Sequence, residues 1–191
     1  FDSGKPIYCQ GASTTTYATF GVGLRPNSIW LEMGPPGNQV ELTNSSFDYD
    51  QWNHIAISFD NGLVKTYING SIASTVQAPS NVISNNGYGA FIGRRGNTIN
   101  VDESYSFQGA ISHFSSVPYV LRYDEIIQSM IVSDSLGTNG SNWNFNEGEG
   151  SILNDLSSNV NHGTINGAIW TGDYPKPGCT DPYAENFDSN V

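Results

Sequence analysis

Gln51–Gly70, with the sequence QWNHIAISFDNGLVKTYING, decides the fold of this chain. From Ile55 to Phe59, large apolar residues alternate with Ala and Ser, which gives an extended strand one apolar face. Asn61 and Gly62 follow, and this pair suits a type I′ turn because both positions need a positive φ. A second alternating run then leads to another Asn-Gly pair. The stretch therefore predicts consecutive antiparallel hairpins.

Short runs of the same kind, broken by Gly, Asn and Pro, recur along the chain, and they are typical of a sandwich or jelly roll. The strands expected are residues 16–24, 28–33, 40–43, 55–59, 64–68, 72–76, 88–93 and 105–114. One short helix is expected over residues 121–130, with Leu121, Ile126, Ile127 and Met130 on one face. The predicted fold class is all-β, a two-sheet antiparallel jelly-roll sandwich with one short helical segment.

The composition excludes several classes of partner. Seven Lys and Arg against 18 Asp and Glu give a formal charge of −11, so the chain cannot neutralise a phosphate backbone, and we expect no nucleic-acid partner. Such a charge fits either a solvated surface or a protein that takes up cations. No apolar run approaches the roughly 20 residues of a membrane helix, so no membrane insertion is expected.

Four blocks, in this order and spacing, resemble the laminin G-like, or concanavalin A-like, jelly-roll family. They are Trp52 with His54 and Tyr67–Gly70, then Ile92-Gly93, then Phe107–Ile111, then Leu121 with Glu125-Ile126. The resemblance covers roughly residues 5–130 and implies the fold more firmly than the function. It also implies a first strand before residues 6–8 that this sequence does not contain, so that strand is expected either outside this sequence or from another chain.

The end of the chain differs in character. Residues 143–170 resemble a segment that accompanies bacterial and viral members of the family, and residues 178–188 resemble a short repeat of secreted marine bacterial and phage proteins. Such repeats usually end in a second Cys, which is missing here, and the pairing of Cys9 and Cys179 stays open. We expect a jelly roll over 1–134, further strands and an Asp/Asn loop completing the sandwich over 135–172, and a linker with a truncated repeat over 173–191.

A catalytic site is not expected. Related glucanases carry alternating carboxylates on one strand, and no such run occurs here. Glu147 and Glu149 alternate but flank glycines, and no Gly-x-Ser-x-Gly elbow is present. For His54 and His113 a packed, hydrogen-bonded role is favoured over a catalytic one.

Calcium is the expected ion, because it prefers carboxylate, amide and backbone oxygens at alternating loop positions. The predicted ligands are Asp155, Ser157, Asn159 and Asn161, with Asp181 and Asp188 in a second acidic cluster. The alternative for the first group is a turn whose Asp, Ser and Asn side chains cap their own backbone.

A glycan site needs an aromatic platform and planar polar groups. The predicted ligand-binding residues are Trp30, Tyr88, Arg94, Arg95 and Tyr105. An arginine can hold a carboxylate or sulfate with two parallel hydrogen bonds. The alternative is that Trp30 is a core residue and that the arginines pair with surface acids.

These features predict a non-catalytic extracellular recognition module that binds a polysaccharide or glycoprotein, with calcium where the loop requires it. The alternative is a structural or adhesive domain of a virion or cell-surface fibre that acts through protein–protein contacts with other subunits. Either function places the chain outside the cell, on a cell surface or on a virion surface.

Overall fold

The computed structural model describes residues 5–11, 20–26, 28–33, 39–43, 50–78, 89–94, 106–132, 136, 139–173 and 175. Two compact units divide the chain, Phe1–Gly109 and Ala110–Val191. The first unit contains two antiparallel sheets. One has the order β4-β3-β2-β1-β8, with β1 Lys5–Gln10, β2 Phe20–Arg25, β3 Ser28–Met33, β4 Gln39–Thr43 and β8 Ala90–Ile92. The other is β5-β6-β7, with β5 Ile55–Asp60, β6 Leu63–Ile68 and β7 Ser71–Gln77.

The two Asn-Gly pairs form the turns expected from the sequence. Asn61 and Gly62 have φ values of 47° and 84°, and Asn69 and Gly70 have 47° and 79°. The first pair joins β5 to β6 in continuous antiparallel register, with Ile55 opposite Ile68 and Asp60 opposite Leu63. Asn69 also ties the hairpin together, because its Oδ1 accepts a hydrogen bond from the backbone N–H of His54 at 2.8 Å. The predicted hairpins are therefore confirmed.

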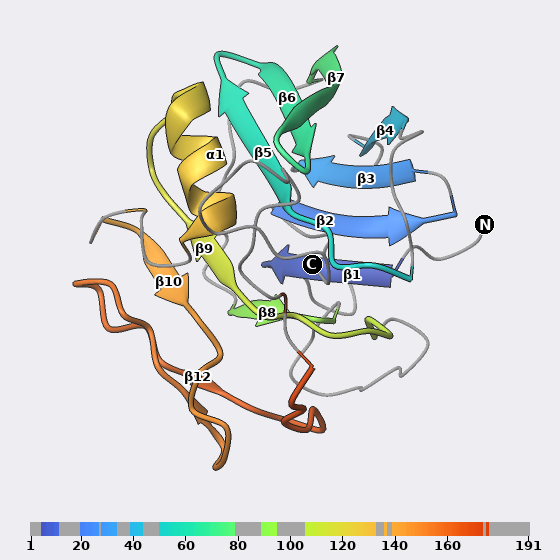
Figure 1. Ribbon diagram of the computed structural model, residues 1–191. Coiled ribbons are helices and arrows are strands. Elements are labelled where there is room, and N and C mark those ends of the chain that lie inside the picture. The colour runs from blue at the N-terminus through green and yellow to red at the C-terminus, as the bar shows by residue number, and fades with distance from the viewer. Residues whose placement is uncertain are drawn as a thin grey trace, which may run out of the picture. The chain divides into compact units, whose positions relative to one another are not determined.

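The apolar core lies between these two sheets. Its buried residues are Val22, Leu24, Ile29, Leu31, Met33 and Leu42 from the five-stranded sheet, with Val64, Ile68 and Ala78 from the second sheet and its end. Strand β3 supplies every second residue to this core, as a pleated strand must. The two-sheet antiparallel sandwich predicted from the sequence is confirmed (Figure 1).

The five-stranded sheet also has a face that turns away from the core, which we call the non-core face. Residues directly opposite each other on antiparallel strands share a face. One row of such residues crosses all five strands, and a second row runs beside it. The first row is Phe91, Cys9, Gly21, Glu32 and Gln39, and the second is Pro6, Gly23, Trp30 and Glu41. Because Cys9, Trp30 and Glu32 are all buried, β3 is covered on both faces.

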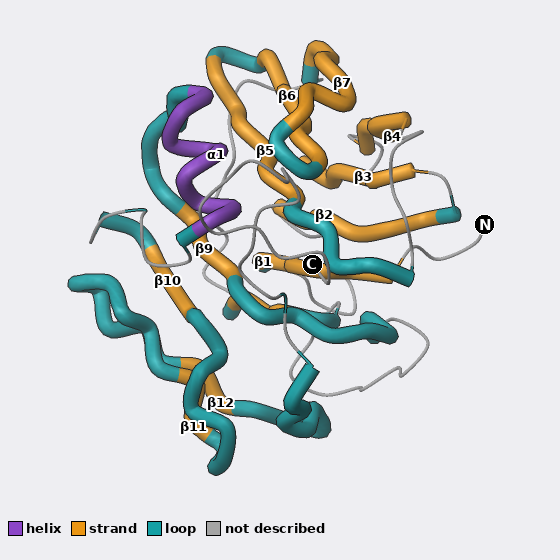
Figure 2. Tube along the Cα trace, in the orientation of Figure 1, coloured by secondary structure: helices purple, strands orange, loops and turns teal. Residues whose placement is uncertain are grey.

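In its described residues, the second unit combines one helix with short strand pairs. Strand β9 (Phe114–Ser116) pairs with β10 (Ser141–Trp143), and β11 (Ile152–Leu153) pairs with β12 (Gly163–Thr164). After β10 the described chain is mostly loop (Figure 2). Since β10 comes from residues 135–172 and β9 from residues 1–134, strands from these two predicted segments pair with each other. The predicted boundaries at 134 and 172 stay predictions.

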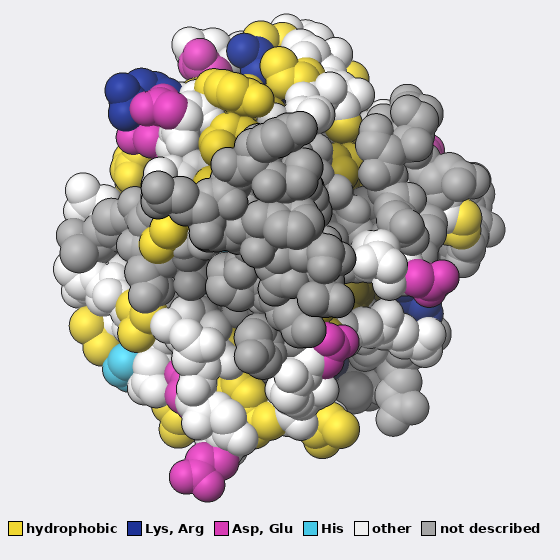
Figure 3. Space-filling model, in the orientation of Figure 1, with side chains coloured by type: hydrophobic (Ala, Val, Ile, Leu, Met, Phe, Trp, Pro, Cys, Tyr) yellow, Lys and Arg dark blue, Asp and Glu magenta, His cyan; other side chains and the backbone are white. Residues whose placement is uncertain are grey.

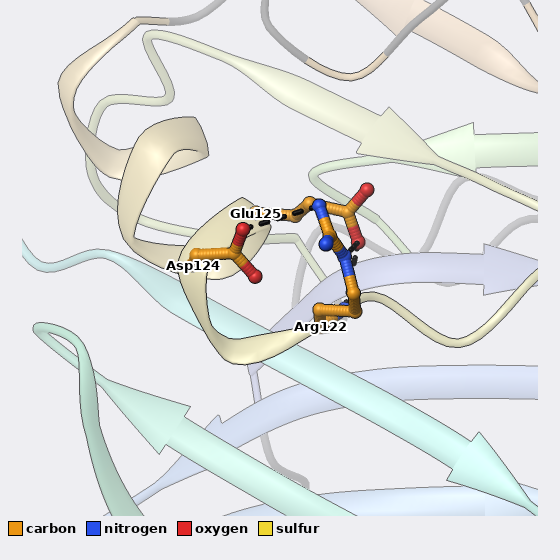
Figure 4. A network of polar contacts seen from close by, with 3 residues as sticks. All are labelled: Arg122, Asp124 and Glu125. Atoms are coloured by element: carbon orange, nitrogen blue, oxygen red, sulfur yellow. Dashed lines mark hydrogen bonds and ion pairs between the residues drawn. The ribbon is translucent and has the colours of Figure 1, made fainter.

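Helix α1 (Tyr123–Ile131) lies close to the predicted 121–130. Glu125 fixes its start, because its Oε2 accepts the Arg122 backbone N–H at 2.7 Å. Arg122 also forms ion pairs with Asp124 and Glu125 at 3.1 and 3.4 Å (Figure 4). No helix in the described part of the chain has the length and apolar character to span a bilayer.

One local prediction was wrong. Residues 105–114 do not form one strand: within the described part, Ser106 makes an isolated bridge to Arg94, residues 107–113 are irregular, and β9 begins only at Phe114. On α1, Met130 is 41% exposed, whereas Ser129 is buried beside Ile126. Ser129 can occupy this position because its hydroxyl donates to the Ile126 carbonyl at 2.8 Å.

Candidate functional site

The predicted ligand-binding residues that the structure describes, Trp30 and Arg94, both belong to the five-stranded sheet and its immediate end. Trp30 lies on the non-core face of β3, and Arg94 follows the edge strand β8. Tyr88, Arg95 and Tyr105, like the predicted metal ligands Asp181 and Asp188, lie outside the described residues. The candidate site is therefore built from the non-core face and its β8 edge.

Trp30 is buried rather than displayed. Only 4% of the residue is exposed, and its indole lies across the sheet against Gly23, where an added Cβ would come within 2.6 Å of Trp30 Cε2. Its Nε1 has no hydrogen-bond partner among the described residues. Trp30 is absent from the apolar core between the sheets. Its indole thus packs against the sheet and presents no open ring surface for stacking.

Arg94 is held against an aromatic ring. Its Cζ lies 5.7 Å from the centre of the Phe91 ring, within the range of a cation–π contact. Both residues are partly exposed. The Arg94 backbone is fixed by its bridge to Ser106, and the Gly93 N–H donates to the Ile7 carbonyl at 2.7 Å. Nη2 of Arg94 is buried and has no hydrogen-bond partner within the described part of the chain.

A polar cluster marks the opposite edge of the same sheet. Arg25 pairs with Glu41 at 3.5 Å, and the Ser28 hydroxyl donates to the same carboxylate. Glu32 lies on the same face, 1% exposed. Glu32 and Glu41 occupy diagonal positions on adjacent strands, because Glu32 faces Gln39 and Glu41 faces Trp30. The non-core face therefore carries acids, aromatic rings and arginines together.

The predicted metal ligands of the second unit meet in a loop organised by Asp155. Asp155 is 4% exposed. Its Oδ1 accepts the backbone N–H groups of Asn142 and Ser157 at 2.8 and 2.9 Å. Its Oδ2 accepts the Asn161 N–H at 2.9 Å and lies 2.9 Å from the Ser157 hydroxyl. Asn159 instead donates its side-chain amide to the Gly140 carbonyl.

These contacts lower the pKa of Asp155. Burial by itself raises the pKa of a carboxyl group, since it disfavours the charged form. Here the hydrogen bonds from Asn142, Ser157 and Asn161 outweigh burial, and they hold the pKa below the ordinary value of 3.8. At neutral pH the Asp155 carboxylate is therefore ionised, and its hydrogen bonds hold the loop together.

The hydrogen bonds around Asp155 are those expected of the alternative to calcium binding, a turn whose Asp, Ser and Asn side chains cap their own backbone. A calcium ion on these oxygens would compete with the N–H and O–H donors that already point at them. Within the described ranges, no group of three or more His, Cys, Asp and Glu side chains lies close enough to hold a metal ion. Calcium binding stays a prediction.

The three histidines also have structural contacts. His113 Nε2 lies 2.8 Å from Asn142 Oδ1, and His162 Nδ1 accepts the Asp155 backbone N–H at 3.1 Å. The backbone of His54 is bound by Asn69, as described above. Glu147, one of the two alternating glutamates, also has a structural contact. Its Oε1 accepts hydrogen bonds from the backbone and side-chain N–H groups of Asn154 at 2.7 and 3.0 Å. The His113 contact agrees with the packed, hydrogen-bonded role expected for that side chain, whereas the contact given for His54 is made by its backbone.

Sequence reasoning missed Phe91 and Glu32. Phe91 lies in the predicted strand 88–93, but its contact with Arg94 depends on where β8 ends. Glu32 alternates with Trp30 in the predicted strand 28–33, and this alternation was the signal that could have placed both on one face.

Comparisons with known proteins agree with the observed fold. Residues 2–127 match the Laminin G model described as the concanavalin A-like lectin/glucanases superfamily. No curated protein matches the chain. Among solved structures, it is similar to a "putative carbohydrate binding protein" from Bacteroides ovatus, with 17% identity and a TM-score of 0.63 over 86% of this chain and 48% of that one. The chain thus spans about half the length of that structure. An S-layer domain-containing protein from Clostridium thermocellum shares 20% identity over 67% of this chain and 63% of that one, but its TM-score of 0.33 is too low to support an argument.

Proposed function

Because this chain belongs to the concanavalin A-like lectin/glucanases superfamily, we propose that it is a non-catalytic module that binds a polysaccharide or glycoprotein. The match over residues 2–127 confirms the family resemblance seen in the sequence. The carbohydrate binding attributed to the Bacteroides ovatus protein supports the proposal. The observation that carries it is the partly exposed pair of Arg94 and Phe91 at the edge of the non-core face, where the guanidinium lies over the ring.

A binding role fits the chemistry of this edge. Lectin sites combine a flat apolar surface with a few fixed polar groups. Phe91 supplies an aromatic ring and Arg94 supplies a planar set of donors, and the two side chains are in cation–π contact. Tyr88, Arg95 and Tyr105 extend the proposed site in the sequence. Trp30, which is buried, is proposed to support the face from beneath rather than to contact the glycan.

The carboxylates of the non-core face favour binding over hydrolysis. Glycoside hydrolysis needs two carboxyl groups that both face the substrate. Glu41 is engaged by Arg25 and Ser28, and Glu32 is buried. We therefore propose that neither carboxylate acts in catalysis.

A glycan array is the direct test. We expect the chain to retain at least one class of glycan, and chromatography of that glycan after long incubation should show unchanged chain lengths. Arg94→Ala should weaken retention, whereas Arg122→Ala, which removes an arginine from the start of α1, should not. Failure to bind any glycan would contradict the proposal, and shortened chains would contradict its non-catalytic part.

The same array tests calcium. Loss of binding in EDTA that added calcium restores would support the calcium prediction. Unchanged binding in EDTA would favour the capped loop around Asp155.

The alternative function, a structural or adhesive domain of a fibre or virion, is favoured by one observation. Several large apolar side chains on and beside α1 are exposed, and such patches mark protein contacts. They are Tyr119, Val120, Tyr123, Met130, Ile131 and Val132. Light scattering across a concentration series would favour this alternative if the chain formed a defined oligomer. Both functions are proposed to operate outside the cell or on a cell or virion surface, which fits a composition rich in Asn, Ser and Gly and poor in Lys.

A further inference from the structure

We propose that Asn166 is a site of spontaneous covalent modification, at which the backbone of the chain displaces the side-chain amide as ammonia. It is the fastest such site among the Asn-Gly pairs that the structure describes. Asn166 precedes Gly167 in the exposed loop that follows β12 in the second unit. The inference goes beyond the proposed glycan binding and does not depend on it.

The reaction is an intramolecular attack on a carboxamide. The backbone nitrogen of Gly167 bonds to Cγ of Asn166 and passes its proton through solvent to Nδ2, and the Cγ–Nδ2 bond breaks with release of ammonia. The resulting five-membered cyclic imide takes up one water molecule and opens at either of its two carbonyl groups. The products are aspartate and isoaspartate, each with one new carboxyl group. Glycine favours this attack, because it has no Cβ to hinder its nitrogen.

The sequence alone does not choose the site, because it contains five Asn-Gly pairs. Ring closure requires rotation about the Cα–C and Cα–Cβ bonds of the asparagine. A pair whose backbone or carboxamide is fixed therefore reacts only through local opening of the structure, which slows it. One pair, Asn86 with Gly87, lies outside the described residues, and the comparison is made among the pairs at Asn61, Asn69, Asn139 and Asn166.

The two pairs in the β5-β6-β7 sheet are fixed in tight turns. The antiparallel ladder closes directly on both sides of each turn, which holds the backbone of the asparagine. The carboxamide of Asn69 is held as well, because its Oδ1 accepts the His54 N–H at 2.8 Å and its Nδ2 donates to Asn53 Oδ1 at 3.3 Å. Asn61 donates through Nδ2 to Asp60 Oδ1 at 2.9 Å. Both pairs should therefore react slowly in the folded chain.

The pair at Asn139 is fixed by its glycine. An added Cβ on Gly140 would collide with the Ser116 carbonyl oxygen, so the backbone at this position is closely packed. The Gly140 carbonyl also accepts the Ser157 hydroxyl at 2.9 Å and the Asn159 side-chain amide. These contacts restrict the movement that would bring the Gly140 nitrogen to the asparagine side chain.

The loop that carries Asn166 is anchored only at its ends among the described contacts. Before it, the Ile165 N–H donates to the Ser151 carbonyl at 2.8 Å, and after it, the Trp170 indole N–H donates to the Gly150 carbonyl at 3.1 Å. Each of residues 166–169 between these anchors is exposed. Exposed segments with few buried contacts open at low cost in free energy, so the backbone rotations needed for ring closure are accessible here.

The two reacting groups are themselves open to solvent. An added Cβ on Gly167 would meet no described atom within 4 Å, so the backbone nitrogen beside it has room to move. The carboxamide of Asn166 donates to the Thr164 carbonyl at 3.2 Å, which is at the long end of the range for such a bond, and both partners are exposed. Water can therefore replace this contact and release the side chain.

The test is incubation of the full chain in mildly alkaline buffer, with peptic peptides followed by mass spectrometry over time. Labelling with an isoaspartyl methyltransferase detects the isoaspartate product independently. We expect Asn166 to be converted about tenfold or more faster than Asn69, because Asn69 must first break the hydrogen bonds that hold it. The same comparison in concentrated urea should show similar rates at the two sites, because unfolding removes the contacts that protect Asn69.

Two variants sharpen the comparison. Asn166→Gln should lose the fast product, because the longer side chain would have to close a larger ring. Asn53→Ala removes the acceptor of the Asn69 side-chain amide and should accelerate conversion of Asn69 severalfold while that of Asn166 stays unchanged. Circular dichroism would establish that both variants are folded.

Two results would overturn the inference. Conversion of Asn166 in the folded chain no faster than that of Asn61, Asn69 or Asn139 would remove it as the preferred site. A rate difference between Asn166 and Asn69 that persisted unchanged in urea would assign it to local sequence rather than to the structure. Neither result bears on glycan binding, and failure to bind any glycan would leave this modification site intact.

Discussion

Asp155 shows how one carboxylate can organise a loop that has little regular secondary structure. Its two oxygens receive donors from residues 142, 157 and 161, which brings together segments about 20 positions apart in the chain. The alternation of Asp155, Ser157, Asn159 and Asn161 was visible in the sequence. Whether their oxygens face outward or accept internal donors was not, because that depends on the position of β10.

The pH dependence of stability follows from this residue. Since the pKa of Asp155 is lowered on folding, its stabilising contribution is fully present above the ordinary value of 3.8 and is lost as the pH falls through the lower folded value. Asp155→Asn should destabilise the protein by about 2 kcal/mol at pH 7, because bonds to a buried charged acceptor are lost. Thermal melting of both proteins from pH 7 to pH 2 should show that the stability difference between wild type and variant decreases only below about pH 4. A stability difference that stays constant down to pH 2 would contradict the stabilising role of the ionised Asp155 carboxylate.

Gly23 is expected to tolerate no side chain. A Cβ there would lie 2.6 Å from Trp30 Cε2 and 2.7 Å from the Lys5 carbonyl oxygen, and neither the buried indole nor the sheet backbone can easily move. Gly23→Ala should therefore cost about 1–3 kcal/mol in the free energy of unfolding, measured by urea denaturation. Gly89→Ala is the matched control, because a Cβ at that position meets nothing within 4 Å. Equal stability of the two variants would show that Trp30 does not lie against Gly23.

Among single residues, sequence predicts those whose role is local. Asn61 and Gly62 were predictable because the turn they form depends on their own φ values. The contact between Phe91 and Arg94 was not, because it depends on where β8 ends and on the bridge that holds Arg94 to Ser106.

At the scale of elements, a strand was predicted correctly when its sequence alternates and a neighbouring strand is present to pair with it. Strand β3 was predicted with its observed bounds, because its alternation continues to both ends. Residues 105–114 alternate too, but only Ser106 and Phe114 make ladder contacts in the described structure. A pattern shows that a segment could pair, and only the tertiary structure supplies the neighbour. Strands β11 and β12, with two residues each, are too short to show any period.

Helix α1 has one terminal contact that can be tested. Glu125→Ala removes the acceptor of the Arg122 N–H and should destabilise the second unit by about 1 kcal/mol. Glu125→Gln retains an acceptor oxygen and should cost less. Asp124→Ala removes an ion pair between side chains that are both about 70% exposed, so little change is expected in chemical denaturation. A larger loss for Asp124→Ala than for Glu125→Ala would contradict the role of Glu125.

For the whole molecule, the sequence predicted the sandwich because alternating strands leave few other ways to bury their apolar faces. It did not predict the buried second face of β3, where Trp30 and Glu32 lie. The distribution of charge was only partly predictable. Figure 3 shows acidic side chains of the described residues at several places on the face drawn.

The central claim is that the edge of the five-stranded sheet binds a glycan through Arg94 without changing it. The most direct measurement is a calorimetric titration of the best array glycan into the wild-type chain and into Arg94→Ala. We predict saturable binding by the wild type and an affinity lower by about tenfold or more for the variant, with melting temperatures alike. Equal affinities for the two proteins would contradict the claim.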